Sequence, residues 1–125
     1  MNIVVKVIDG RTYINVTPHT ITLRDSAGQD HEVPPSGVLI NARPVEEPAG
    51  NRTGIELVRT RFVADEASER AIAELERAYP GAFIVGSIIA AQAFPGRVLA
   101  MVPVPGLERV PPEQKRMRAD KFTVF

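Results

Sequence analysis

Apolar and polar residues alternate along much of the first half of the chain, which is the spacing of β-strands that bury one face. Residues 3–8 are rich in valine and isoleucine, and a second β-like run covers residues 12–16. Between them stands Asp9-Gly10, a dipeptide that strongly favours a tight hairpin turn. The chain is therefore predicted to begin with a β-hairpin.

A second hairpin is predicted in the next segment. Residues 20–24 alternate like a half-buried strand and precede turn-forming residues at 25–28. A short run at 31–33 stops at Pro34-Pro35-Ser36-Gly37, and residues 38–40 are expected to begin another strand.

Prolines, glycines and polar residues between Arg43 and Gly54 predict an exposed loop with its tip near Gly50-Asn51. A strand is expected over residues 55–63. Its period of two places Arg59 and Arg61 on one face.

The clearest helix is predicted over residues 65–79. Asp65 can cap its start, apolar residues recur at helical spacing, and Pro80-Gly81 ends it. Residues 83–85 are a buried-strand candidate, after which Gly86-Ser87 could cap a short helix over residues 88–94, although that segment could instead stay extended.

The last part of the chain is predicted to hold a strand over residues 97–104. After Pro111-Pro112, one or two basic helical turns are expected with Lys115, Arg116 and Arg118. Residues 122–125 are expected to pack back onto the body. These elements together predict one α+β domain with a hairpin-rich first half.

Composition narrows the classes of function. The chain has 125 residues with 15 basic and 15 acidic side chains, so no overall field draws it onto DNA or an anionic membrane. It has no cysteine, which excludes disulfides, thiolate zinc sites and thiol nucleophiles and suits a reducing cytosol. Without a signal-peptide or membrane-spanning pattern, a cytoplasmic location is expected.

Catalytic motifs are not recognisable in the sequence. No nucleophile elbow is present, and neither His19 nor His31 belongs to a known local motif. His19 is interpreted as a turn residue, and His31 as part of a solvated face, since alternation turns Asp30 and Glu32 to the opposite side. An enzyme using either histidine with a carboxylate is the least favoured hypothesis, and no metal or cofactor is expected.

Binding of an anion has more support in the sequence than catalysis has. Free N–H groups at Gly86-Ser87 could hold a phosphate, although ordinary helix capping is the favoured explanation of this pair. Arg59 and Arg61 offer paired cations, and Phe83 could stack on a base. The candidate ligand-binding residues are Arg59, Arg61, Phe83, Gly86, Ser87, Gln92 and Arg109.

The order of several motifs resembles a family of small phage and prophage proteins. It is carried by Asn15-Val16-Thr17-Pro18-His19, by Pro34-Pro35-Ser36-Gly37, and by Phe83-Ile84-Val85-Gly86-Ser87 with Ala90-Ala91-Gln92-Ala93. Members often begin at an Asn-Leu-Thr-Pro-His motif, so Val16 replaces a leucine here and residues 1–13 add a strand. The C-terminal stretch departs from the aspartate- and glycine-rich ending expected of the family.

Most members of that family have no assigned activity. Phage proteins of this size include oligomeric sponges that sequester cyclic nucleotide signals of bacterial immunity, and the Thoeris anti-defence sponges are the comparison this implies. The leading hypothesis is therefore a non-enzymatic homo-oligomer that sequesters a phosphorylated nucleotide, with no membrane or sequence-specific nucleic-acid partner. The alternative is a protein-interaction module that engages a host protein through strand edges or the 43–54 segment.

Overall fold

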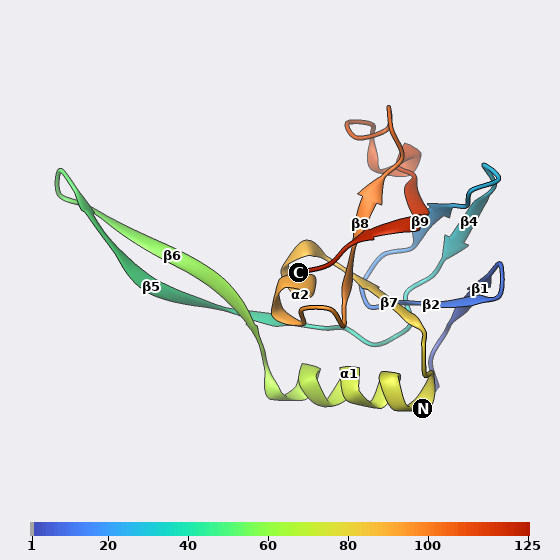
Figure 1. Ribbon diagram of the computed structural model, residues 1–125, viewed down its shortest axis with the longest axis horizontal. Coiled ribbons are helices and arrows are strands. Elements are labelled where there is room, and N and C mark those ends of the chain that lie inside the picture. Colours follow the sequence, from blue (N-terminus) through green and yellow to red (C-terminus); the bar gives the residue numbers. More distant parts are fainter. Residues whose placement is uncertain (1) are drawn as a thin grey trace.

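A seven-stranded mixed sheet forms the body of the protein in the computed structural model, which describes residues 2–125 (Figure 1). The strands follow the order β1-β2-β7-β8-β9-β3-β4. Their bounds are β1 Lys6–Ile8, β2 Arg11–Asn15, β3 Ile21–Arg24, β4 Asp30–Val33, β7 Phe83–Gly86, β8 Leu99–Pro103 and β9 Met117–Thr123. The mixed α+β class predicted from the sequence is confirmed.

Both hairpins of the first half are present. β1 and β2 pair antiparallel, and Asp9 and Gly10 have φ angles of 50° and 76°, as a tight turn of type I′ requires. β3 and β4 pair antiparallel around residues 25–29. The prediction of a strand over residues 38–40 is wrong, because those residues connect the sheet to the next element without pairing to any strand.

The sheet curls until it is nearly a closed barrel. β2 pairs in parallel with β7, β7 with β8, and β9 with β3, so strands distant in sequence lie side by side. An isolated bridge joins Asn15 to Pro35 just after β4, and the Ser36 N–H donates to the Asn15 carbonyl at 2.8 Å. These contacts bring the β4 edge of the sheet toward β2 and so nearly close the barrel.

Two cores lie on opposite sides of the curled sheet, because side chains alternate along each strand. Tyr13 and Val85 point into the barrel, where they pack with Ile8, Leu23, Val33 and Ala119. Ile14 and Ile84 point outward and pack against the two helices.

The first helix matches the sequence prediction, and the segment over residues 88–94, which could have stayed extended, is helical in the structure. α1 covers Glu66–Ala78, with the Asp65 side chain accepting the Ser68 N–H at 2.7 Å, and α2 covers Ile88–Ala93. Arg97 ties the segment after α2 to α1 through ion pairs with Glu69 and Glu76, at 2.6 and 2.8 Å. Among the described residues, no helix is long and apolar enough to cross a membrane.

A long two-stranded hairpin replaces the loop expected over residues 43–54. β5 (Ala42–Arg52) pairs antiparallel with β6 (Ile55–Ala64) and projects away from the body (Figure 1). The turn falls at Thr53-Gly54, later than predicted. Proline is tolerated in an edge strand where its nitrogen faces away from the partner strand, and at bulges such as the one between Pro48 and Gly50, so these prolines do not exclude a strand. We call residues 42–64 the arm.

The basic helical turns expected after Pro111-Pro112 are also mostly wrong. Only a 3-10 turn forms, at Pro112–Gln114, and Arg118 lies on β9. Pairing with β3 and β8 decides this segment, because it supplies the backbone partners that a short basic helix would lack. Phe122 packs against the barrel core as expected, whereas Phe125 is exposed.

Candidate ligand-binding site

A cavity of about 400 Å³ opens at one side of the barrel, between β2, β7 and β9. Aromatic rings and charged side chains line it together. We call it the aromatic cavity; its principal lining residues are Arg11, Tyr13, Phe83, Asp120, Lys121 and Phe122. This size lies within the range of small-molecule sites.

Tyr13 forms the floor of the aromatic cavity. Its ring is buried, and its hydroxyl donates to the Ala119 carbonyl at 2.7 Å, which fixes β2 against β9 across the barrel. Burial raises the pKa of the Tyr13 phenol above its usual range, while the nearby charge of Arg11 opposes this shift. The phenol is thus a neutral, rigid support.

Two half-buried phenylalanines flank this ring. Phe83 stacks on Tyr13 with ring centres 5.5 Å apart, and Phe122 lies tilted at 6.2 Å. The Tyr13 ring covers Phe83 from one side, so Phe83 and Phe122 form an apolar lining of the kind on which flat rings stack.

Positive charge is available at the rim. Arg11 and Lys121 are exposed, and neither has an ion-pair partner among residues 2–125. Asp120, by contrast, pairs with Arg118 at 2.9 Å, and that hydrogen bond lowers the pKa of the Asp120 carboxyl. The carboxylate is therefore already partnered, while two cations remain free for an anion.

An irregularity in β9 brings these rim residues to the cavity. Met101 of β8 pairs with Phe122 of β9, whereas Pro103 pairs with Met117. Two steps along β8 therefore correspond to five steps along β9. The extra β9 residues between them include Asp120 and Lys121. Bulged strands re-aim side chains in this way, often beside functional sites.

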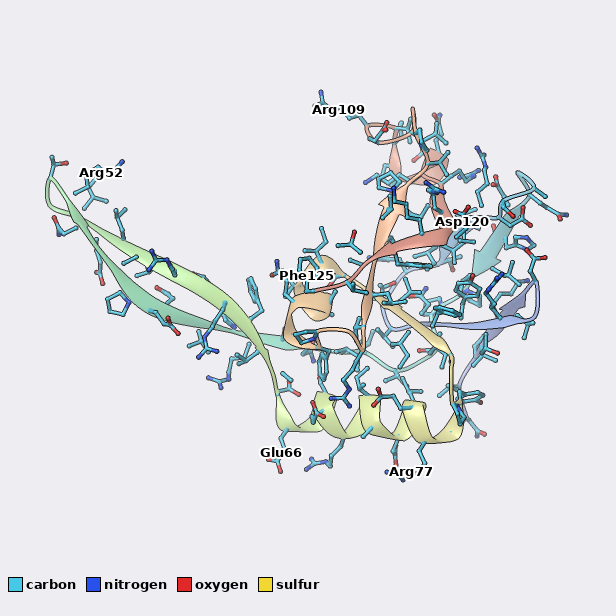
Figure 2. The ribbon with its side chains drawn as sticks, in the orientation of Figure 1. Arg52, Glu66, Arg77, Arg109, Asp120 and Phe125 are labelled. Atoms are coloured by element: carbon cyan, nitrogen blue, oxygen red, sulfur yellow. The ribbon has the colours of Figure 1, made fainter. Side chains whose placement is uncertain are left out.

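The sequence-predicted site residues are dispersed. Phe83 lines the aromatic cavity, but Arg59 and Arg61 lie on the arm, where Arg61 pairs with Glu47 at 3.0 Å. Gln92 is exposed on α2. Figure 2 shows Arg109 projecting from the connection between β8 and β9, well apart from Arg52 at the tip of the arm.

Gly86 and Ser87 have packing and capping roles. A Cβ on Gly86 would lie 2.8 Å from Val98 Cγ1, so the glycine allows close approach of neighbouring elements. The Ser87 hydroxyl accepts the Ala90 N–H at 3.1 Å and so caps α2. Ser87 also borders a smaller cavity of about 150 Å³, lined by no cationic side chain. That cavity suits an anion less well.

The Asn-x-Thr-Pro-His motif forms a closed hydrogen-bond network at the end of β2. The fully buried Asn15 amide donates to the carbonyls of His19 and Val33, at 2.7 and 3.0 Å. Its Oδ1 accepts from the N–H and the hydroxyl of Thr17. Every polar atom of Asn15 is engaged, and the His19 ring is exposed, so the motif stabilises a turn.

His31 has a carboxylate partner, Asp25, which side-chain alternation along its own strand does not predict. Its Nε2 lies 2.8 Å from Asp25 Oδ2, and Asp25 Oδ1 accepts the N–H groups of Ala27 and Gln29. The hydrogen bond with His31, followed by the backbone bonds, lowers the pKa of Asp25. The pair fixes the β3–β4 turn. Residues 2–125 contain no cluster of three or more His, Asp or Glu side chains arranged to hold a metal.

Sequence reasoning missed Arg11, Tyr13, Lys121 and Phe122. Arg11 directly follows the Asp9-Gly10 turn, and a cation at the start of a buried strand was a usable signal. The expected packing of residues 122–125 onto the body does not say which strands they meet. Only the β9 irregularity and the barrel closure place Lys121 and Phe122 beside β2.

Comparison with protein-family models, curated proteins and solved structures finds no match to this chain.

Proposed function

We propose that the protein binds a phosphorylated nucleotide in the aromatic cavity and holds it without chemical change. The observation that carries the proposal is the combination of Phe83 and Phe122 with two unpaired cations, Arg11 and Lys121, around one cavity. A nucleotide presents the complementary pair of features, a flat ring and an anion.

The volume supports a small ligand. A cavity of about 400 Å³ suits a mononucleotide or one half of a larger signal, with the remainder extending past the exposed rim. Arg11 offers a guanidinium that can bind two phosphate oxygens together, and Lys121 a mobile point charge.

Capture is favoured over catalysis by the state of the candidate acid–base groups. Tyr13 donates its hydroxyl hydrogen to a backbone carbonyl, and Asp120 is held by Arg118. The His31–Asp25 pair is engaged in its turn. None of these groups is both free and next to the two cations, as a general base acting on a bound phosphate needs.

The resemblance to small phage proteins supports a role for this binding in a bacterial host. A protein that retains a cyclic nucleotide or a cyclic ADP-ribose derivative lowers its free concentration, and in a bacterial host this counteracts immune signalling. On this account the protein acts in the cytoplasm.

The experiment is capture followed by release. Purified protein is incubated with a panel of cyclic nucleotides and ADP-ribose derivatives, filtered, then heat-denatured, and both fractions are analysed by mass spectrometry. The proposal predicts that one panel compound is depleted from the filtrate and is recovered intact on heating. Recovery of a modified compound contradicts capture, and no depletion across the panel contradicts nucleotide binding.

A further inference from the structure

A second cavity adjoins the aromatic cavity. It has a volume of about 180 Å³ and shares two lining residues, Ser26 and Asp120, with the aromatic cavity. We call it the side cavity; its other lining residues are Arg24, Asp25, Val104, Pro105 and Arg118. Because the two cavities have a common wall, a ligand held in one can extend into the other.

Size and lining suit the side cavity to one part of a ligand. Sites for whole small molecules usually measure about 300–1,000 Å³, and the side cavity lies below this range. Among residues 2–125, no aromatic side chain lines it, so a base would find no ring to stack on there. Its chemical feature is a pair of arginines, which favours a phosphate with its sugar.

The two arginines are held in fixed orientations. Arg24 and Arg118 lie directly opposite each other on β3 and β9, which pair in parallel. Arg24 donates through Nε and Nη2 to the Asp30 carboxylate at 2.7 and 3.3 Å. Arg118 makes the same two-point contact with Asp120 at 2.9 and 3.2 Å.

Each guanidinium nevertheless keeps donors for an anion. The side chains of Arg24 and Arg118 are 34% and 32% exposed, so solvent reaches both. Within residues 2–125, the Nη1 group of neither arginine has a hydrogen-bond partner. Two oriented Nη1 groups on neighbouring strands can therefore bind the oxygens of one phosphate.

The carboxylates around the side cavity are already engaged. Asp25 is buried and accepts hydrogen bonds from two backbone N–H groups besides its contact with His31. Asp120, labelled in Figure 2, is held by Arg118 and forms part of the common wall. A carboxylate in that place can accept a hydroxyl of a ribose that crosses from one cavity to the other.

We propose that the ligand is a dinucleotide, with one base and its phosphate in the aromatic cavity and the sugar phosphate of the second nucleotide in the side cavity. This inference rests on the proposed nucleotide binding. It adds the class of the ligand and a second phosphate subsite at Arg24 and Arg118.

Calorimetric titration tests this by comparing cyclic di-AMP with cyclic AMP, and cyclic di-GMP with cyclic GMP. Each pair differs by one nucleotide unit and one phosphate. For the base that the protein accepts, the dinucleotide should bind about 100-fold more tightly, at about tenfold for each of the two added arginine contacts. Arg24→Ala should weaken binding of the dinucleotide about tenfold and leave binding of the mononucleotide unchanged.

Arg70→Ala is the matched control. It also removes an arginine from an exposed ion pair, with Glu66 on α1, but it lines neither cavity, so it should leave both affinities unchanged. Pro105→Glu is a second variant that keeps both arginines and their carboxylate partners. Its added carboxylate should repel the second phosphate and weaken binding of the dinucleotide alone, by about tenfold. It decides the question if Arg24→Ala does not fold.

The outcomes separate this inference from nucleotide binding itself. Equal affinities for the dinucleotide and the mononucleotide overturn the second subsite and leave the aromatic cavity as the site. Equal losses for both ligands in a folded Arg24→Ala or Pro105→Glu variant overturn it as well. Retention of an ADP-ribose derivative but of neither dinucleotide overturns the dinucleotide class and spares the proposed function. If no panel compound binds, both proposals fail.

Discussion

At the scale of single residues, buried polar groups with complete hydrogen bonding hold the turns that shape the barrel. Asn15 is fully buried and makes bonds to Thr17, His19 and Val33. Asp25 does the same for the β3–β4 turn with His31. Removing one partner from such a network leaves the others unpaired, which costs more than the bond itself contributes.

Asn15→Asp should lower the free energy of unfolding by about 3 kcal/mol, because a carboxylate oxygen would replace the donor that faces the carbonyls of His19 and Val33. Chemical denaturation measures this. Asn51→Asp is the control, since Asn51 is exposed and uses only its Oδ1, as acceptor from the Gly54 N–H. Equal stability of both variants would remove the structural role assigned to the motif.

Asp25 should contribute stability that depends on pH. Its pKa in the folded protein is below the ordinary 3.8, so the contribution is full above about pH 4 and fades as pH falls toward the folded value. Asp25→Asn should therefore melt below the wild type at pH 6, and the difference should shrink between pH 4 and pH 2. A difference that stays constant with pH would contradict this cause.

At the scale of elements, the sequence predicts the features that neighbouring residues determine, namely helix caps and tight turns. The cap at Asp65 predicted the start of α1, Asp9-Gly10 predicted the first turn, and Ser87 offered a cap for α2 without excluding an extended segment. The arm was missed because its prolines suggested a loop. β9 was missed because its strand character comes from pairing with β3 and β8, which are distant in sequence.

The packing of β7 under α2 depends on Gly86. In Gly86→Ala the new Cβ would meet Val98 at 2.8 Å and Val16 at 3.2 Å, so the variant should lose about 2 kcal/mol of stability. Val98→Ala should therefore cost less stability in the Gly86→Ala background than in the wild type, because it makes room for the new Cβ, and a double-mutant cycle measures this difference. Strictly additive effects would show that the glycine serves something other than close packing.

At the scale of the whole molecule, closure of the barrel creates a site that no segment contains. Arg11, Phe83 and Lys121 come from three strands that meet only when β2, β7 and β9 curl together. Of the candidate residues proposed from the sequence, Phe83 alone lines the aromatic cavity. Sequence spacing groups Arg59 with Arg61 but does not show where their hairpin projects, and the arm carries both away from that cavity.

The most direct test compares two pairs of cations by calorimetric titration with the panel nucleotide that the protein retains. Arg11→Ala/Lys121→Ala removes the pair at the aromatic cavity, and Arg59→Ala/Arg61→Ala removes the pair on the arm. The account predicts that the first variant binds about 100-fold more weakly, at about tenfold per lost charged contact, and that the second binds like the wild type. Unchanged affinity in the first variant with loss in the second would contradict it and place the ligand on the arm.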